Sequence, residues 1–316
     1  MSVGRRQRKN RALLIVMKSF HTRCPLPPRR GAGADARKLF RVLSDLGFAV
    51  TQHFDLTAQE VMDAYQEEIA KEQGDYFLSV LSSHGDEGVI FDFNGCPVKL
   101  TDIFAMFTPR RCPVLAGKTK MFFVQACRGE MLDPGVDVET DSCSETQDSF
   151  SHYLSIPNDT TVMFASSPGY GAFLNASGSA FLQTLCELLS SEARELELLQ
   201  LLTRVSHRVA YRFEARGQHS GSREMPCIVT NMTQEAFPFA THAVHDQVRQ
   251  GEETPSRTCD QHPDGHCDTT CTLQRRDLNR FPKLNSGIRG CLWNQRPLPS
   301  REFEATLCSS LDLKAL

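Results

Sequence analysis

Two residues capable of nucleophilic and acid–base chemistry each follow an apolar run of strand length. His84 comes directly after YFLSVLSS (76–83), and Cys127 comes directly after KMFFVQA (120–126). Parallel strands present their carboxyl ends along one edge of an open α/β sheet, and binding sites form at that edge. If both runs are strands of such a sheet, His84 and Cys127 can face one another.

A cysteine beside a histidine is the pairing that thiol-based peptide cleavage requires. The thiolate is the attacking species and an unassisted thiol has a pKa of about 8.5, so His84 would take the proton of Cys127 and return one to the leaving amine. Gly85 frees the main chain to turn its N–H toward a developing oxyanion, beside the N–H of Cys127. Taken singly, however, a cysteine after a strand or a lone histidine is more often structural than catalytic.

Buried strands and amphipathic helices alternate up to about residue 240 and must position this pair. Apolar runs typical of buried strands lie at 12–17, 76–83, 120–126, 161–166 and 227–232. Helical patterns lie at 36–46, from Thr57 with Glu60 completing a capping box, at 181–189 and at 196–213. This alternation predicts a three-layer α/β/α sandwich around a mostly parallel sheet.

The composition excludes several classes of protein. The 316 residues include 35 Lys and Arg against 38 Asp and Glu, so the net charge of −3 does not draw the chain toward nucleic acid or an anionic membrane. The apolar run 12–17 is far shorter than the roughly 20 residues that span a bilayer, and no signal-peptide cleavage site follows it. We therefore expect a cytoplasmic protein, with no nucleic-acid or membrane partner, whose twelve cysteines are free.

The residues around Cys127 identify a family. Gln-Ala-Cys-Arg-Gly (125–129), with a histidine some 50 residues upstream, is the local signature of caspases. The chain resembles a caspase with a very short pro-segment from about residue 11 to 240, and it is most similar to the executioner type in LLTRVSHRVAYRF (201–213) and MPCIVTNMTQEAF (225–237). The resemblance implies a caspase-like fold and a cofactor-free cysteine endopeptidase that cleaves proteins after Asp in apoptosis-like or related proteolytic signalling.

The resemblance also assigns roles to residues. It implies that Cys127 is the nucleophile, that His84 is the general acid and base, that the amides of Gly85 and Cys127 form the oxyanion hole, and that the backbone carbonyl of Pro27 orients the histidine. In this family the aspartate at P1, the residue before the cleaved bond, lies between two arginines and a glutamine, of which Arg29 and Gln125 match one arginine and the glutamine. The implied substrate-binding residues are Arg29, Gln125, Ser83, Ala172, Phe173 and Leu174. No metal site is implied.

The same resemblance divides the chain into subunits. It implies a basic pro-segment at 1–10, a large subunit at 11–141, a small subunit at 142–240 with the linker at about 132–155, and an irregular, disordered tail at 241–316. Cleavage after Asp141 in Val-Glu-Thr-Asp, by an upstream activating caspase, would separate the subunits, with Asp148 as a second candidate. By composition alone this stretch is merely an acidic exposed loop. Two processed subunit pairs would form a homodimer through the final strand.

The small subunit departs from the family pattern where substrate binds. Where caspases carry Gly-Tyr-Tyr-Ser-Trp-Arg, this chain reads Gly-Tyr-Gly-Ala-Phe-Leu (169–174), so the second arginine becomes Leu174 and an aromatic wall becomes Gly171. The tryptophan of Gly-Ser-Trp-Phe likewise becomes Ala180. Two functions stay open: an endopeptidase selecting Asp or a broadened acidic P1, and a weakly active or inactive regulator that binds other caspases or their partners.

The tail has no counterpart in the family. It holds ligand-type residues at short spacings that match no standard zinc pattern, namely Cys259, His262, His266, Cys267 and Cys271. We expect an unstructured extension there rather than a metal site.

Overall fold

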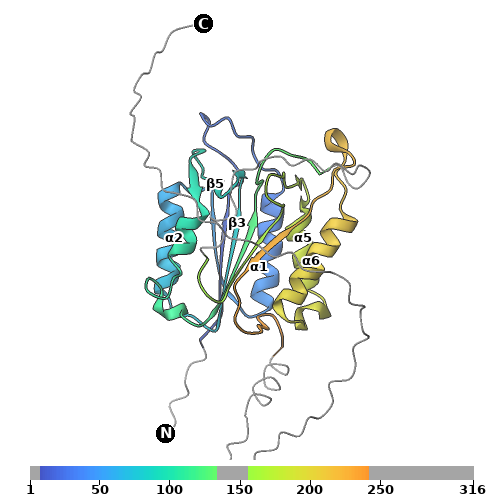
Figure 1. The fold of residues 1–316 in the computed structure, drawn as a ribbon. Coiled ribbons are helices and arrows are strands. Elements are labelled where there is room, and N and C mark those ends of the chain that lie inside the picture. Colours follow the sequence, from blue (N-terminus) through green and yellow to red (C-terminus); the bar gives the residue numbers. More distant parts are fainter. Residues whose placement is uncertain (1–7, 134–155, 242–316) are drawn as a thin grey trace, which may run out of the picture. The chain divides into compact units, whose positions relative to one another are not determined.

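The computed structural model describes residues 8–133 and 156–241, which are built around a six-stranded sheet (Figure 1). Its strand order is β11-β8-β7-β3-β1-β2, and every neighbouring pair is parallel except β11 with β8. The strands are β1 (Arg11–Val16), β2 (Ala49–Phe54), β3 (Tyr76–Ser82), β7 (Thr119–Gln125), β8 (Thr160–Phe164) and β11 (Cys227–Thr230). The mostly parallel sheet expected from the apolar runs is confirmed.

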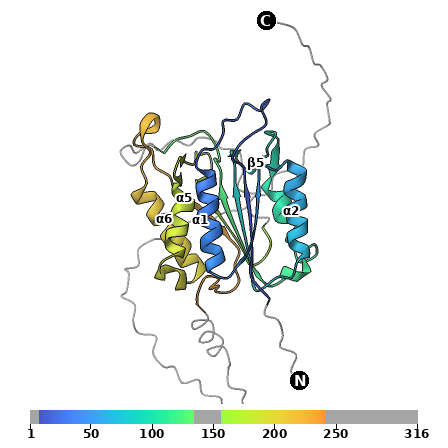
Figure 2. The same ribbon diagram turned by 180° about the vertical axis from the view of Figure 1, so that it is seen from behind.

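Helices cover both faces of this sheet. On one face lie α1 (Ala32–Asp45), α5 (Ala180–Leu189) and α6 (Leu198–Arg212), and on the other lies α2 (Ala58–Ala70), as Figures 1 and 2 show from opposite sides. The short α3 (Leu100–Ala105) packs into the same core as α2. The three-layer α/β/α sandwich is therefore confirmed.

The two faces of the sheet contribute to separate hydrophobic cores. Along β7, Met121 and Phe123 pack with α1, α5 and α6, whereas Phe122 and Val124 pack with α2 and α3. All seven residues of β7 are buried, because successive side chains point to opposite faces and both faces are covered. This is why the strand appears in the sequence as a continuous apolar run.

The structure also contains short elements that apolar periodicity does not reveal. A small antiparallel sheet, β4 (Gly85–Asp86), β5 (Val89–Phe91) and β6 (Pro97–Lys99), follows His84, and the hairpin of β9 (Leu174–Asn175) and β10 (Gly178–Ser179) precedes α5. Three 3₁₀ turns lie at Pro113–Leu115, Glu192–Glu195 and Gly217–His219. Helix α1 begins at Ala32, four residues before the expected start, and β11 ends at Thr230 rather than 232.

The capping box predicted at Thr57 is confirmed. The Thr57 side chain accepts a hydrogen bond from the Glu60 N–H, and the Glu60 carboxylate accepts one of 2.8 Å from the Thr57 N–H. Two donors at the helix start are thereby satisfied, and Thr57 is the N-cap residue, with the helix proper beginning at Ala58. Within 8–133 and 156–241, no helix is long and apolar enough to cross a membrane.

Several expectations lie outside the described residues. These are most of the pro-segment at 1–10, the linker with its cleavage candidates Asp141 and Asp148, and the tail beyond Thr241 with its cysteines and histidines. They stay predictions.

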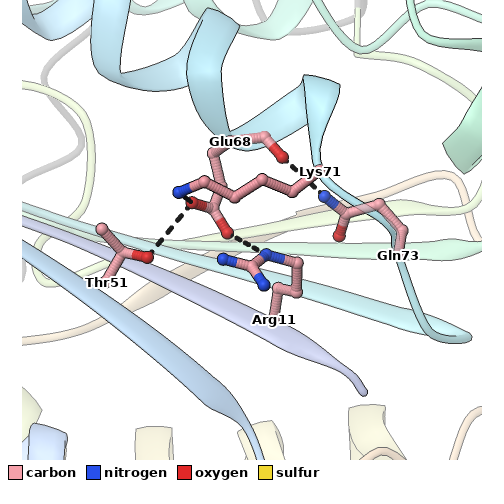
Figure 3. A network of polar contacts seen from close by, with 5 residues as sticks. All are labelled: Arg11, Thr51, Glu68, Lys71 and Gln73. Carbon is pink, nitrogen blue, oxygen red and sulfur yellow. Dashed lines mark hydrogen bonds and ion pairs between the residues drawn. The ribbon is translucent and has the colours of Figure 1, made fainter. Parts of the chain in front are cut away.

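A buried carboxylate ties β1, β2 and α2 together at the end of the sheet opposite the strand carboxyl ends (Figure 3). Glu68 is fully buried on α2, and its carboxylate accepts hydrogen bonds from Arg11 of β1, from Lys71 at 2.6 Å and from Thr51 of β2 at 3.2 Å. Gln73 donates to the backbone carbonyl of Glu68 at 2.7 Å. Burial opposes the charge of Glu68, but the hydrogen bonds and charges of Arg11 and Lys71 outweigh burial and lower its pKa.

We predict that Glu68→Gln lowers the free energy of unfolding by about 3 kcal/mol at pH 7, because it leaves the Arg11 guanidinium without its charged partner. Since the pKa of Glu68 is lower in the folded than in the unfolded protein, this stability is present above the unfolded value, about 4.3, and is lost as pH falls through the folded value. Urea unfolding at pH 7 and pH 3.5 measures both effects, with Glu67→Gln on the exposed face of α2 as the control. If the free energy of unfolding of Glu68→Gln is lower than that of wild type by the same amount at both pH values, the prediction is contradicted.

Candidate active site

The register of β3 and β7 brings His84 and Cys127 to the same level of the sheet. Every pair in this parallel register, from Tyr76 with Thr119 to Ser82 with Gln125, is offset by 43 positions. His84 and Cys127 are also 43 positions apart, two residues beyond the last pair. The N–H of Ser83 continues the ladder by donating to the Gln125 carbonyl at 3.1 Å. The expected meeting of the two residues at the strand carboxyl ends is therefore observed.

Both residues open into a pocket of about 370 Å³. It is lined by Pro28, Arg29, Arg30, Ser83, His84, Gln125, Ala126, Cys127, Ala172, Leu174, Asn175 and Ala176. The lining thus combines the ends of β3 and β7 with the loop before α1 and the segment 172–176. Of the predicted site residues, the structure brings seven together here, and Pro27 and Gly85 flank the pocket in sequence.

The Cys127 sulfur rests against the main chain of Ala172. The Ala172 N–H donates to the sulfur at 3.4 Å, and the sulfur lies 3.7 Å from the Ala172 carbonyl oxygen. The thiol is half-buried. The nucleophile predicted from one part of the sequence is therefore positioned by a loop 45 residues further along the chain.

The His84 ring is in hydrogen-bonding contact with the backbone of Pro27. The His84 Nε2 lies 2.9 Å from the Pro27 carbonyl oxygen, which can only accept, so Nε2 carries the proton and Nδ1 keeps a free lone pair. The ring of Phe20 packs against that of His84, with centroids 5.2 Å apart. Burial lowers the pKa of His84, the Pro27 hydrogen bond opposes this, and the Arg29 charge adds to it. At neutral pH the imidazole is therefore in the form that can accept a proton.

Gly85 is required by close packing against the cysteine loop. A Cβ at this position would lie 2.7 Å from the Val89 carbonyl oxygen, 2.9 Å from the Ala126 Cβ and 3.2 Å from the Cys127 carbonyl oxygen. Any side chain here would push β4 away from the cysteine loop. The main chains of Gly85 and Cys127 are thus adjacent, which is the arrangement that an oxyanion hole needs.

The cysteine loop is also tied to the segment at 169–172. Arg128 donates its N–H to the Tyr170 carbonyl at 2.9 Å and accepts from the Gly169 N–H at 2.8 Å. Its side chain is buried and pairs with Glu87 at 2.9 Å. Arg128 of the pentapeptide therefore braces the loop rather than facing the pocket.

Arg29 lies in the pocket wall with part of its hydrogen-bonding capacity already used. It is 6% exposed and donates to the Met17 carbonyl at 2.8 Å and to the Ser82 hydroxyl at 3.1 Å. Burial lowers its pKa to about 10, while the charges of Asp35 and Cys127 oppose that effect. Gln125, in the same wall, is also buried, and its Oε1 has no partner within the described part of the chain. The hydrogen bonds of Arg29 hold its side chain in the wall, and Gln125 lines the same pocket.

The segment that departs from the family pattern divides between the pocket and the core. Ala172 and Leu174 line the pocket, and Leu174 also packs against Val16, Ala32 and Ala36. Phe173 does not line this pocket, contrary to its expected grouping with the others. Its ring packs against that of Phe213, with centroids 5.2 Å apart, because successive side chains of an extended segment point in opposite directions.

One buried group beneath this segment was not predicted. Glu224 is 1% exposed; one carboxyl oxygen accepts from the Phe173 N–H at 2.8 Å, and the other has no partner among the described residues. Burial raises its pKa to about 8; the Phe173 hydrogen bond opposes this, and the charge of Asp35 adds to it. The only signal in the sequence is an acidic residue just before an apolar strand, which does not suggest burial.

The pocket has further lining residues that sequence reasoning did not select, namely Pro28, Arg30, Ala126, Asn175 and Ala176. Arg30 could have been noticed, because it stands next to Arg29. No group of three or more His, Cys, Asp or Glu residues in the described ranges is placed to hold a metal ion.

Known proteins that are similar to this chain are caspases. A family model described as the caspase domain matches residues 9–238. The caspase-3 proteins of Felis catus and Mus musculus are 36% and 34% identical over 232 residues, covering 71% of this chain and 82% of each relative. The crystal structure of caspase-1 from Spodoptera frugiperda is similar with a TM-score of 0.65 and 29% identity, covering 75% of this chain and 92% of that one.

We predict that Glu224→Gln stabilises the protein increasingly as pH rises. The amide oxygen still accepts from Phe173, but the buried group can no longer ionise. The pKa of Glu224 is raised to about 8 in the folded protein, compared with about 4.3 in the unfolded chain. The contribution of Glu224 to stability is therefore greatest below about pH 4.3 and is lost as pH rises through about 8. Melting temperatures of both proteins from pH 4.5 to 8.5 should diverge by several degrees, with exposed Glu235→Gln as the control. If the two melting temperatures change in parallel with pH, the pKa of Glu224 is not raised in the folded protein.

Proposed function

This chain belongs to the caspase family, and on that premise we propose that it is a cysteine endopeptidase cleaving protein substrates after Asp or a broadened set of acidic residues. The observation that carries the proposal is one pocket in which Cys127, a histidine oriented by Pro27, and Arg29 meet. This arrangement supplies a nucleophile, a proton carrier and a cation for an acidic side chain.

In the proposed reaction His84 takes the proton of Cys127 through its free Nδ1. The thiolate attacks the carbonyl carbon of the scissile peptide, forming a carbon–sulfur bond, and the carbonyl oxygen becomes an oxyanion beside the amides of Gly85 and Cys127. His84 then gives its proton to the leaving amine as the carbon–nitrogen bond breaks. A water molecule, deprotonated by His84, attacks the resulting thioester, and the carbon–sulfur bond breaks to release the acid and the thiol.

Arg29 is the group we assign to the acidic P1 side chain. Moving a carboxylate out of water is costly unless a charged hydrogen-bond partner meets it, and Arg29 is buried in the pocket wall facing the reaction centre. Leu174, another lining residue, offers only apolar surface. We infer weaker discrimination among P1 residues than a pocket with arginines on both sides would give.

The regulatory part of the proposal rests on the resemblance and on the linker sequence. Cleavage near Asp141 by an upstream caspase would activate the chain, and two processed pairs would dimerise along β11, an edge strand of the sheet. The proposed setting is apoptosis-like or related proteolytic signalling in the cytoplasm.

A specific observation favours a second function. Leu174 is packed against Val16, Ala32 and Ala36, so the pocket is adapted to an apolar residue rather than merely lacking an arginine. A weakly active regulator that binds other caspases or their partners would tolerate this change. Retention of both His84 and Cys127 favours the enzyme.

We predict that Cys127→Ala and His84→Ala each abolish peptidase activity while leaving the melting temperature within a few degrees of wild type, because both side chains lie at strand ends rather than in a core. Labelling with an acyloxymethyl ketone ending in Asp measures the reactivity of the thiol directly. Wild type should be labelled at Cys127, and Cys127→Ala should not. A folded wild-type protein that is neither labelled nor active would favour the regulator.

We predict that Leu174→Arg raises kcat/KM on Asp-ended peptides by about ten- to a hundredfold and leaves peptides with an uncharged P1 residue nearly unchanged, because one charge-assisted contact is gained. The variant should also melt a few degrees lower, since packing against Val16 and Ala32 is lost. Steady-state kinetics on matched Asp and Asn peptides give the ratio. An unchanged ratio in a folded, active variant would place the P1 side chain away from Leu174.

A further inference from the structure

We infer that Arg30 determines substrate specificity by supplying a second guanidinium to the acidic side chain bound in the pocket. This inference rests on the proposed function, because it concerns the same pocket and the same substrate class. It extends that function by assigning a residue from the loop before α1 to a task that the segment at 172–174 does not perform.

The first argument is that Arg29 alone offers only part of its hydrogen-bonding capacity to a ligand, while Asp35 partly offsets its charge. Two of its N–H groups are already bound to Met17 and Ser82, and the buried carboxyl of Asp35 lies close enough to interact with its charge. Arg29 therefore serves partly as a structural element of the wall. A substrate carboxylate has two oxygens and several lone pairs to satisfy, and Arg29 leaves room for another donor.

The second argument is that Arg30 is uncommitted. Arg30 lines the pocket and is exposed, and its side chain makes no hydrogen bond or ion pair with any residue in the described part of the chain. The lining includes no Asp or Glu that could neutralise it. A free guanidinium with five donors at the rim of a pocket without acidic residues can turn toward an incoming carboxylate.

The third argument is that the backbone holds Arg30 at this position. The Arg29 N–H donates to the Lys18 carbonyl at 2.8 Å, and the Ala32 N–H donates to the Arg29 carbonyl at 3.2 Å. Gly31, with a φ of 123°, is so close to the β9–β10 hairpin that a Cβ would lie 1.8 Å from the Asn175 carbonyl oxygen. Arg30 is thereby fixed between a buried anchor and the hairpin, at the pocket rim.

The fourth argument concerns Leu174. It lines the same pocket while packing into the small cluster of Val16, Ala32 and Ala36, next to the segment that holds Arg29 and Arg30. It offers no donor, so a second donor to the substrate carboxylate must come from another lining residue. Of the two arginines that line the pocket, Arg30 has no competing partner, whereas Arg29 is partly bound.

A binding experiment tests the inference without requiring turnover. In the Cys127→Ala background, the Kd of amide-capped peptides ending in Asp or in Asn is measured by fluorescence anisotropy with and without Arg30→Gln. Arg30→Gln should reduce the preference for Asp over Asn by about fivefold or more, the range for one charge-assisted contact that is partly exposed to solvent. Arg23→Gln removes an exposed arginine of the same loop that does not line the pocket, and it should leave the preference unchanged.

A second arm couples Arg30 to Leu174. If both positions serve the same carboxylate, Leu174→Arg should raise the Asp-to-Asn ratio more in the Arg30→Gln background than in wild type. Equal gains in the two backgrounds would show that Arg30 acts elsewhere and would overturn the inference.

The outcomes separate this inference from the proposed function. If wild type cleaves after Asp but Arg30→Gln keeps its Asp-to-Asn ratio, the inference fails and the proposed function stands. Wild type could instead cleave nothing while the Cys127→Ala protein binds Asp peptides more tightly than Asn peptides and loses that preference with Arg30→Gln. In that case the inference stands and the enzyme proposal fails. Absence of any preference for Asp peptides, or an equal loss with Arg23→Gln, overturns the inference.

Discussion

The constant offset between β3 and β7 is the constraint on which the site depends. A parallel pair admits no gradual adjustment, because a slip of one residue turns every side chain to the other face of the sheet. Both faces of β7 are buried between helices, so the register cannot move without breaking a core. The level at which His84 and Cys127 stand on the sheet is therefore fixed by the packing of the strands, and the chemistry at the strand ends depends on that packing.

Around this pair the chain adds contacts from distant segments rather than from neighbours in sequence. The imidazole is oriented by Pro27, from the loop after β1, and the sulfur is met by Ala172, from the segment before α5. Each contact uses a backbone group, which substitutions at that residue leave in place, apart from proline at position 172. Such a site tolerates sequence change along its walls, and this is where Leu174 departs from the family pattern.

Sequence reasoning predicted those parts of the molecule that follow a repeating rule. The strands buried on both faces and the capping box at Thr57 carry local patterns, and each was found as expected. The pentapeptide around Cys127 indicated the family whose model matches the chain. Strand β2 (Ala49–Phe54) was missed because it lies at the sheet edge and nearly all its residues are half-buried, which leaves no apolar run. Glu224 was missed because its burial is decided by tertiary packing and not by its neighbours in sequence.

The pairing of β7 with β8 has a consequence for the integrity of the chain. Five residue pairs join these two strands, which lie on either side of the linker, and residues from both sides share the same core. A break anywhere between Asp133 and Ile156 removes none of these pairs. The two pieces would then behave as complementary fragments, each incomplete without the other, so that cutting the backbone changes the number of chain ends but not the hydrophobic surface that holds the protein together.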